Sequence, residues 1–544
     1  MLALSKRSRL RRLRSMMRGY RLLMRSDNLG LIRRIRAALV DARLDYPGHG
    51  GSRFMLGVGS AHAELVARQY VLAWIGGLRL ERALMFSLGS EGRAVVFPLP
   101  KAWRDILTEH GFVVARRRCA LAWAGFIALF WVYGVLVIMK HLALMVHTKF
   151  RRGTPSRGRY AYFGKLTTAN LPQPGRDGRS HDVFTWYAHW SGRAQGLQSL
   201  GHGVRGAERA VAEGLPVRFV GDAIPPLTSL AGQLRFTGWA IGAVIRSSFD
   251  AMRGRWRHAL MLRESAVAAT VRLLETESLA RDYLIKNSAP MYRPLWTYDA
   301  EERGSRILFY FYSTSEQPKL PTGYESDRWD WGPMNWPSYL VWDDYHGNLV
   351  RRVIDNDARV EIVGPIWFET GNVELAEIPS HSVAVFDVQP HRRSTRFAFS
   401  TTGDLSFESP RQENQFLVDI DVVLREHGIA MVLKQKRPIG NLVNRKYAAL
   451  VRQLEKDGVI VVDPSTSPIR VIESCNAVIS YWFTSTAILG REQGKPSIYY
   501  DPLGVIQKDD RAAHGIEVVS GIEELRAWVA RVLGRGEGAQ ETRL

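Results

Sequence analysis

From Val383 to the end of the chain, short apolar runs alternate with helical stretches. The runs have the length of strands, and they are 383–388, 429–435, 459–463, 477–481, 497–500 and 516–520. The stretches between them have helical spacing, and they are 414–427, 443–456, 469–475, 484–493 and 522–533. This alternation is typical of a doubly wound parallel sheet. It predicts a Rossmann-like lobe over residues 380–544.

The first half of the chain has a rougher version of the same pattern. We expect strands at 93–98, 112–115, 160–163, 182–187, 217–220, 307–312 and 360–364, and a long helical stretch at 231–286. A chain of 544 residues is long enough for two or three domains. The predicted fold class is therefore α/β, with a second Rossmann-like lobe over 46–370 and a loop-like region, 370–382, before the C-terminal lobe.

Residues 1–45 are rich in Lys and Arg, with apolar residues interleaved and Asp27 as the first acid. The pattern predicts a basic amphipathic helix on an anionic membrane surface, and a disordered basic tail is the alternative. The formal net charge of +21 also favours anionic partners. No nucleic-acid-binding motif accompanies it, so we expect no nucleic-acid partner.

Within the apolar segment 120–146, residues 120–139 carry no charge and could just cross a bilayer. Both flanks are basic, so they give no orientation. The chain before the apolar segment and the chain after it both have an α/β pattern. A single span would therefore place two parts of one sheet on opposite sides of the membrane. We therefore expect an in-plane or re-entrant element, bending at Gly134, which docks the protein on one membrane face. A true span and a buried core helix are the alternatives.

The two cysteines, Cys119 and Cys475, lie far apart and have no metal-ligand spacing. They predict neither a structural zinc site nor a disulfide framework, and they fit a reducing compartment.

Hydroxyl groups cluster where the strand 477–481 runs into the next helix, at Thr484, Ser485 and Thr486. A helix N-terminus holds anions well, because its free N–H groups and its dipole point at them. The sequence therefore predicts a phosphate site at this strand end, and an ordinary helix cap is the alternative.

Other strand ends in this lobe should converge on the same edge of the sheet. The further residues expected to bind nucleotide or phosphate are Lys434, Lys436, Arg437, Asp463, Glu473 and Tyr500. Lys436 and Arg437 would neutralise leaving-group charge, so we expect no metal and no cofactor. Asp419 and Asp421 have the spacing of a metal-binding DxD motif. They fall inside a predicted helix, however, so we interpret them as part of a helix face.

The earlier lobe should supply the acceptor side and a general base. The candidates are Asp222, Glu316 and Asp343, or its neighbour Asp344. A transfer of polyol phosphate would instead need a base such as His391 beside the phosphate site.

The segments FTSTA, IESCNAVIS, GKPSIYYDP, FDVQPHRR and LKQKR resemble the bacterial polysaccharide-biosynthesis proteins named for a Pro-Phe-Thr-Ser motif. YRPLWTYDAEERGSRILFYFYST, SYLVWDDYHG and EIVGPIWF are also similar to that family, and the resemblance covers roughly residues 90–530. Phe483, Thr484 and Ser485 match the name-giving motif, whereas Trp482 stands where the family has Pro.

The resemblance implies a GT-B-like glycosyltransferase of surface-polysaccharide assembly (capsule or lipopolysaccharide) at the cytoplasmic face of the bacterial inner membrane. Its substrates would be a nucleotide sugar, of which a CMP-linked sugar is a reasonable guess, and a membrane-associated glycan or glycolipid. A polyol-phosphate transferase and a non-catalytic scaffold of polysaccharide assembly remain as alternatives.

Overall fold

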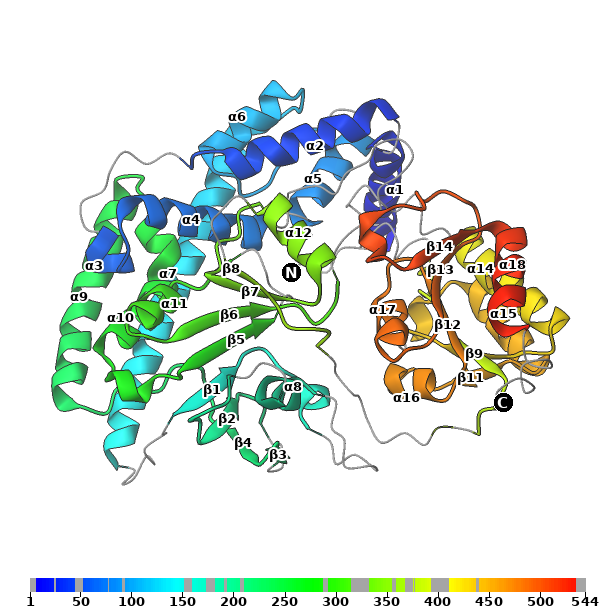
Figure 1. The fold of residues 1–544 in the computed structure, drawn as a ribbon. Coiled ribbons are helices and arrows are strands. Elements are labelled where there is room, and N and C mark those ends of the chain that lie inside the picture. The colour runs from blue at the N-terminus through cyan, green and yellow to red at the C-terminus, as the bar shows by residue number, and fades with distance from the viewer. Residues whose placement is uncertain are drawn as a thin grey trace.

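The computed structural model has an N-terminal and a C-terminal lobe, each built around a largely parallel sheet (Figure 1). The structure describes residues 6–534 apart from 24–25, 45–51, 77, 91–92, 151–158, 173–181, 190–192, 206–209, 287–291, 315–331, 355–358, 367–374, 376, 393–409 and 437–439. The expected fold class, α/β with two Rossmann-like lobes, is confirmed by the two sheets.

The region before the long apolar helix is helical. Its helices are α1 (Lys6–Leu23), α2 (Ser26–Asp41), α3 (Ser52–Leu56), α4 (Ser60–Ile75), α5 (Leu78–Gly89) and α6 (Lys101–Glu109). The strands expected at 93–98 and 112–115 are wrong, because the two segments share a single bridge, Val95 with Val114. Pro98 and Pro100 interrupt the first segment, since proline cannot donate to a ladder.

The basic segment forms a helix, as expected, and α1 packs closely on α5. A Cβ on Gly19 would lie 1.8 Å from the Met85 carbonyl oxygen, and one on Gly89 would lie 1.7 Å from that of Ser15. Only glycine permits this approach of the two backbones. Arg11, Arg12, Arg14 and Arg18 remain exposed on α1, so one face of the helix packs inward and another presents charge.

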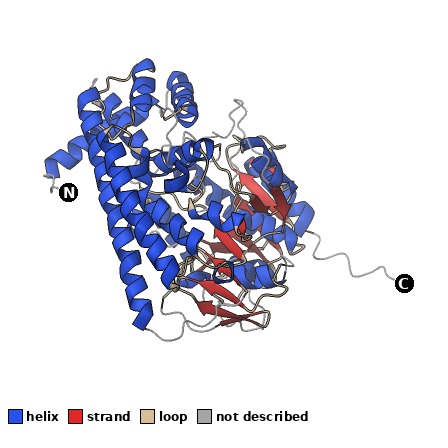
Figure 2. Cartoon of the chain, turned by 90° about the vertical axis from the view of Figure 1, so that its left-hand side faces the viewer, coloured by secondary structure: helices blue, strands red, loops and turns tan. Residues whose placement is uncertain are grey.

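Three long helices form one side of the N-terminal lobe: α7 (Arg116–Phe150), α9 (Leu230–Met252) and α10 (Arg257–Leu273). Figure 2 looks onto this side and shows long helices running side by side. α7 is a single helix, and from Arg116 to Met145 it is apolar and long enough, by length and composition, to cross a membrane.

The N-terminal sheet has the strand order β3-β4-β2-β1-β5-β6-β7-β8. Its strands are β1 (Tyr160–Phe163), β2 (Ser199–His202), β3 (Ala210–Ala212), β4 (Leu215–Phe219), β5 (Asp282–Lys286), β6 (Arg306–Tyr310), β7 (Ser338–Val341) and β8 (Arg359–Ile362). All neighbours are parallel except the hairpin of β3 and β4. Short helices α8 (Val183–His189), α11 (Trp296–Glu302) and α12 (Asp344–Val353) lie between the strands.

Two expectations for this lobe are wrong. Residues 182–187 are not a strand, because the Asp182 carboxylate accepts from the N–H groups of Phe184 (2.8 Å) and Thr185 (3.0 Å) and so starts helix α8. The helical stretch 231–286 breaks after α9, where Gly254 adopts a φ of +74°, and it ends in the strand β5.

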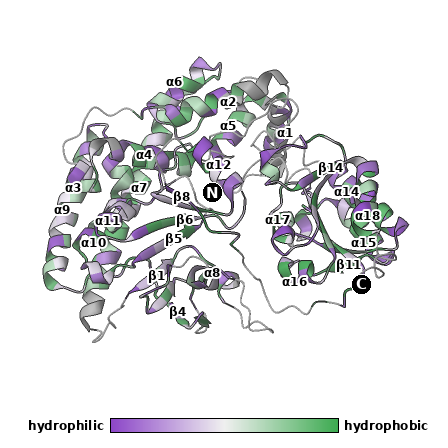
Figure 3. Ribbon diagram, in the orientation of Figure 1, coloured by the Kyte–Doolittle hydropathy of each residue, from purple (hydrophilic) through white to green (hydrophobic). Residues whose placement is uncertain are grey.

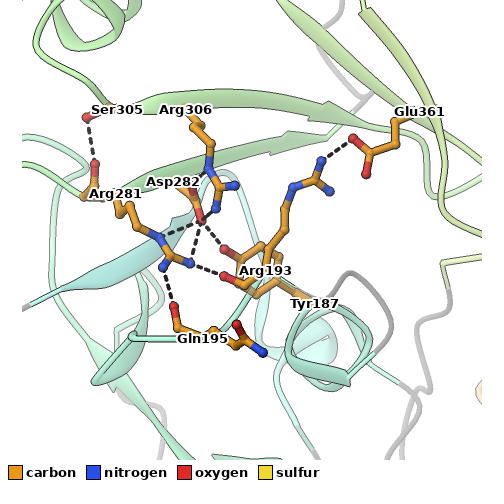
Figure 4. A network of polar contacts seen from close by, with 9 residues as sticks. Tyr187, Arg193, Gln195, Arg281, Asp282, Ser305, Arg306 and Glu361 are labelled. Atoms are coloured by element: carbon orange, nitrogen blue, oxygen red, sulfur yellow. Dashed lines mark hydrogen bonds and ion pairs between the residues drawn. The ribbon is translucent and has the colours of Figure 1, made fainter.

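A network of polar contacts around the buried carboxylate of Asp282 ties the start of β5 to its neighbours (Figure 4). The Asp282 carboxylate accepts from Arg306 Nη2 at 2.6 Å, from Arg281 Nη2 at 3.3 Å and from the Tyr187 hydroxyl. Asp282 lies at the amino end of β5, opposite the edge where parallel sheets bind ligands. We therefore interpret the network as a structural clamp.

The C-terminal lobe follows the predicted alternation closely. Its elements are β9 (Ser382–Phe386), α14 (Pro410–Glu426), β10 (Ala430–Lys434), α15 (Arg445–Lys456), β11 (Ile460–Val462), α16 (Pro468–Glu473), β12 (Ala477–Tyr481), α17 (Ser485–Glu492), β13 (Ser497–Asp501), β14 (Glu517–Ser520) and α18 (Gly521–Leu533). The order is β11-β10-β9-β12-β13-β14, with every pair parallel. The chain thus reverses its direction across the sheet between β9 and β12. Figure 3 colours both lobes by hydropathy.

Candidate functional site

The switch point of the C-terminal sheet lies between the carboxyl ends of β9 and β12. These strands pair directly, with Phe386 opposite Ser480. Open α/β sheets bind ligands in the crevice outside such a reversal of strand order. The loops that begin at Asp387 and Trp482 therefore flank the best candidate site in this lobe.

Asp387 follows β9 and is a buried carboxylic acid with spare hydrogen-bonding capacity. Its Oδ2 accepts from the Tyr447 hydroxyl, and its Oδ1 is buried with no hydrogen-bond partner in the described part of the chain. Burial raises the pKa of Asp387 to about 7, although Tyr447 and the charge of Lys434 act in the opposite direction. A carboxyl group with a pKa near neutral is protonated in part of the molecules at pH 7, and in that form it can donate a hydrogen bond to a phosphate or a sugar hydroxyl. Asp387 lies within the predicted strand 383–388 and was not among the residues expected to bind phosphate.

The three hydroxyls at the start of α17 have different partners. Thr484 Oγ1 donates to the Tyr481 carbonyl at 2.8 Å, and Thr486 Oγ1 lies 3.1 Å from Thr484 Oγ1 and 2.8 Å from Ser480 Oγ. Thr484 therefore does not cap α17 with its side chain. The Ser485 hydroxyl, half-buried in the first turn, makes no hydrogen bond to any residue that the structure describes. Ser485 and the first-turn N–H groups remain free to hold an anion.

The backbone immediately before these hydroxyls is strained. Phe483 has a φ of +55°, a left-handed conformation that bulky residues rarely adopt. Its ring packs edge-on against Tyr499, with 5.2 Å between centroids, and Tyr499 donates to the Thr484 carbonyl at 2.9 Å. Strain of this kind clusters at ligand sites, because the surrounding contacts hold a turn that the sequence does not favour.

Trp482, which replaces the expected proline, stacks on Tyr481 with 4.9 Å between ring centroids. The ring is buried, and its Nε1 has no hydrogen-bond partner among the described residues. A buried indole N–H usually finds an acceptor. Trp482 therefore has a donor to spare beside the switch point.

Lys434 is turned into the fold rather than toward open solvent. Its Nζ donates to the carbonyls of Pro464 (3.1 Å) and Gln435 (3.2 Å), and burial lowers its pKa. The ammonium group is therefore held by backbone carbonyls, and its charge lowers the pKa of Asp387. Lys436 lies two residues further on, and its charge also lowers the pKa of Asp387. Arg437 lies outside the described residues.

The open basic surface of this lobe is formed by other residues. A groove of about 870 Å³ lies between the starts of α14 and α15 and the loop after β9. Among the described residues its lining includes four cations, Arg392, Arg411, Arg445 and Lys446, and no carboxylate. No described carboxylate forms an ion pair with any of the four. Cations brought together without a counter-charge repel one another, which costs free energy. A bound polyanion would remove this repulsion, so the groove suits such a ligand.

Three further residues that we expected to bind nucleotide or phosphate are either exposed or hydrogen-bonded to other residues. Asp463 is exposed and accepts from the Ser465 N–H at 2.7 Å, which is a local turn. Glu473 is exposed at the end of α16. The Tyr500 hydroxyl donates to Asp419 on α14 at 2.6 Å, so its placement does not support the idea that it flanks a base or sugar.

The predicted general bases are dispersed. Asp222 follows β4 and is exposed, with Lys140 Nζ at 3.4 Å. Glu316 lies outside the described residues. Asp343 caps α12 through the His346 N–H at 2.9 Å and contacts His514 in the other lobe. His391 pairs with Val443 in an isolated bridge, next to the groove residue Arg392.

The N-terminal sheet has its own switch point, between β1 and β5. Lys165 follows β1 with a φ of +57°, and Lys286 ends β5. Burial lowers the pKa of both lysines. Sequence reasoning missed this pair, although the Gly-Lys dipeptide directly after a predicted strand was a usable signal. Across the described residues of both lobes, no group of three His, Cys, Asp or Glu side chains could hold a metal ion.

A family model described as "Polysaccharide biosynthesis PFTS motif protein" matches residues 239–529. No curated protein sequence matches the chain. Among solved structures, a UDP co-structure of MnaA from S. aureus is similar at 8% identity and a TM-score of 0.34, over 69% of this chain and 88% of that one. A UDP-glucosyltransferase from Polygonum tinctorium, capable of glucosylating indoxyl, is similar at 12% identity and a TM-score of 0.29, over 70% and 84%. Similarities this weak bear on neither substrate nor activity.

Proposed function

The chain belongs to the polysaccharide biosynthesis PFTS motif family, and from this membership and the geometry of the switch point we propose that it is a glycosyltransferase. The donor is a nucleotide sugar, with a CMP-linked sugar as one candidate. The acceptor is a membrane-associated glycan or lipid of a bacterial surface polysaccharide, such as capsule or lipopolysaccharide, at the cytoplasmic face of the inner membrane.

One observation carries this proposal. At the start of α17 the Ser485 hydroxyl and the first-turn amides lie across the switch point from Asp387 Oδ1, and neither the hydroxyl nor this oxygen has a hydrogen-bond partner among the described residues. The donor phosphate would accept from the first-turn amides and from Ser485. The protonated form of Asp387, which a pKa of about 7 keeps populated at neutral pH, would donate to a second phosphate oxygen or to a ribose hydroxyl. The buried charge of Lys434 would offset the negative charge of the leaving nucleotide without a metal.

In the transfer, the bond from the anomeric carbon to the donor phosphate oxygen breaks, and a bond to the acceptor oxygen forms. The acceptor proton passes to a base from the N-terminal lobe. Asp343 is a poor candidate, because His514 holds its carboxylate and lowers its pKa against the effect of burial. Asp222 and Glu316 remain the candidates for this role.

The basic groove favours a second candidate function, the transfer of polyol phosphate. A polyol-phosphate chain carries one negative charge per unit, and the described lining of the groove offers four cations without a carboxylate. His391 directly precedes Arg392 in the groove wall and would serve as the base. The two functions differ in the bond made, a glycosidic bond or a phosphodiester.

The experiment incubates the full chain with nucleotide sugars and a lipid-linked acceptor, and weighs the product by mass spectrometry. A mass increase of one sugar supports glycosyl transfer, whereas an increase that includes phosphate supports the second candidate. No product and no nucleotide binding would leave a non-catalytic scaffold of polysaccharide assembly as the function.

A further inference from the structure

Helices α7 and α9 lie antiparallel and contact each other along their length. Trp131 on α7 donates to Ser247 Oγ on α9 at 3.1 Å, and His141 stacks on Phe236 with 5.8 Å between ring centroids. Gln233 near the start of α9 reaches the Met145 carbonyl, at 3.5 Å, near the end of α7. The two helices therefore form one continuous surface on the side of the molecule that faces the viewer in Figure 2.

One face of α7 is buried from end to end. Its buried residues recur at helical spacing: Cys119, Trp123, Ile127, Phe130, Gly134, Ile138 and Met145. At Gly134 the helix touches α10 so closely that a Cβ would lie 2.7 Å from the Leu262 Cβ. A helix that crosses a bilayer by itself has no such partner, so α7 is an integral part of the N-terminal lobe.

The other face of α7 is apolar and exposed. Its large hydrophobic side chains are Leu121 (74% exposed), Leu129 (65%), Val132 (47%), Tyr133 (42%), Leu136 (55%), Met139 (59%) and Leu144 (37%). No charged residue interrupts the helix from Cys119 to Met139. Exposed apolar patches of this extent on a folded protein mark an interaction surface.

α9 repeats this arrangement, and the sequence pattern did not predict it. Its exposed residues are Leu230 (59% exposed), Leu234 (64%), Ile241 (60%), Ile245 (65%), Phe249 (44%) and Met252 (79%). Their spacing of three to seven residues places them on one stripe of the helix. Phe54 of α3 (47% exposed) adds to this surface, because its carbonyl accepts from Trp239 Nε1 at 3.0 Å.

The chain on the two sides of α7 packs into one body. Gln69, before α7, donates to the Pro333 carbonyl at 2.6 Å and to Asn335 Oδ1 at 2.8 Å, both after it. Segments that bond to each other directly cannot lie on opposite sides of a bilayer. We expected a span to separate two parts of one sheet, and this was wrong, because the N-terminal sheet begins after α7. The hydrogen bonds of Gln69 nevertheless oppose a span, because they join the chain before α7 to the chain after it.

We propose that the exposed faces of α7 and α9 form a monotopic docking surface that lies in the plane of an anionic phospholipid bilayer. The apolar side chains enter the boundary between headgroups and acyl chains, as amphipathic helices do at interfaces. The proposal goes beyond the transferase reaction and stands or falls independently of nucleotide binding.

The charge at one end of this surface fits an anionic partner. Arg116, Arg117 and Arg118 are exposed at the start of α7. Because the helices are antiparallel, the end of α9 is at the same end, and Arg253 there stacks over Phe249 at 3.9 Å. Cations beside an apolar surface attract anionic headgroups, by about 1 kcal/mol per residue near the surface. A soluble protein partner would not require cations at the end of an exposed apolar surface.

The test is flotation of the full chain with vesicles of phosphatidylethanolamine and phosphatidylglycerol. We expect binding, and we expect the double variant Ile241→Asn/Ile245→Asn to weaken it about tenfold or more, because two exposed side chains no longer enter the bilayer. Leu121→Asn/Leu129→Asn on α7 should have the same effect. The matched control, Leu442→Asn/Leu503→Asn, replaces exposed leucines of the C-terminal lobe and should leave binding unchanged.

Two outcomes would overturn the proposal. One is equal vesicle binding by the wild type and both double variants. The other is a stable dimer of the wild type in solution that the variants abolish, without any vesicle binding. To separate docking from a span, Val113→Cys, before α7, and Val211→Cys, after it, both at exposed positions, are labelled with a membrane-impermeant thiol reagent in one-sided vesicles. Docking predicts labelling of both from the same side, and labelling from opposite sides would contradict it.

Discussion

His514 Nδ1 lies 2.8 Å from Asp343 Oδ2 and joins the two lobes. Asp343 begins α12 directly after β7, and His514 follows the short helix η4 (Arg511–Ala513) after β13. Asp343 therefore lies at the carboxyl edge of the N-terminal sheet, whereas His514 comes just before β14 and lies at the amino edge of the C-terminal sheet. Arg491 Nη2 lies 3.8 Å from the same carboxylate and adds a positive charge beside it.

The contact between Asp343 and His514 predicts a pH-dependent stability. Burial opposes ionisation, but the hydrogen bond from His514 lowers the pKa of Asp343 below its ordinary value. The contribution is therefore present above the unfolded-state pKa, near 4, and is lost as the pH falls below it. We expect Asp343→Asn to lower the free energy of unfolding by about 1–3 kcal/mol at pH 7. Urea titrations at pH 7 and pH 3 test this, and an equal difference at both values would contradict it.

Asp387 predicts the opposite trend. Its pKa is raised to about 7 by burial, so folding favours the protonated carboxyl. Its contribution to stability is full below pH 4 and is lost as the pH rises to about 7. Between these values the wild type should lose up to roughly 4 kcal/mol relative to Asp387→Asn. Thermal unfolding of the two proteins from pH 4 to pH 8 measures the difference, and parallel curves would show that Asp387 does not titrate this way.

Asp282 should be among the most sensitive positions for folding. Asp282→Ala removes the acceptor that Arg281, Arg306 and Tyr187 share, and Arg281 is shown to keep other acceptors, the carbonyls of Gln195 and Arg193. We expect a loss of about 3–5 kcal/mol in the free energy of unfolding. The exposed pair of Asp421 and Arg425 is the control, and Asp421→Ala should cost less than about 1 kcal/mol. Similar losses for both variants would refute the clamp.

The basic groove should bind polyanions. Arg411→Gln/Arg445→Gln removes two of its four cations, and we expect the Kd for inorganic polyphosphate to rise about five- to tenfold at low salt. Arg425→Gln, further along α14 and outside the groove, is the control and should change the Kd little. Calorimetry at two salt concentrations measures this, and equal effects of the two variants would point to charge in general instead of to the groove.

The C-terminal lobe could be predicted from sequence because its strands are buried and parallel. Such strands read as short apolar runs, and 477–481 coincides with β12. The N-terminal lobe was harder. The alternation at 182–187 resembles a strand, and the capping bond of Asp182 that makes it a helix is a three-dimensional detail. Strand β5 was hidden at the end of an amphipathic stretch.

The candidate site was predictable only to the level of strand ends. The sequence placed hydroxyls and cations at the carboxyl edge, but the directions of their side chains depend on tertiary packing. Lys434 turns inward to Pro464, and Tyr500 turns to Asp419. The groove draws on the starts of α14 and α15 as well as the loop after β9, and a linear pattern cannot show that these meet.

The most direct test of the central claim is nucleotide binding by the full chain, measured as a thermal shift with a panel of CMP, UDP, GDP and their sugars. We predict that one nucleotide raises the Tm and that Ser485→Ala lowers its affinity about tenfold or more without changing the Tm of the free protein. Ser474→Ala, at the exposed end of α16, should bind like the wild type. If no nucleotide shifts the Tm, or if Ser485→Ala binds unchanged, the switch point of the C-terminal sheet is not the donor site.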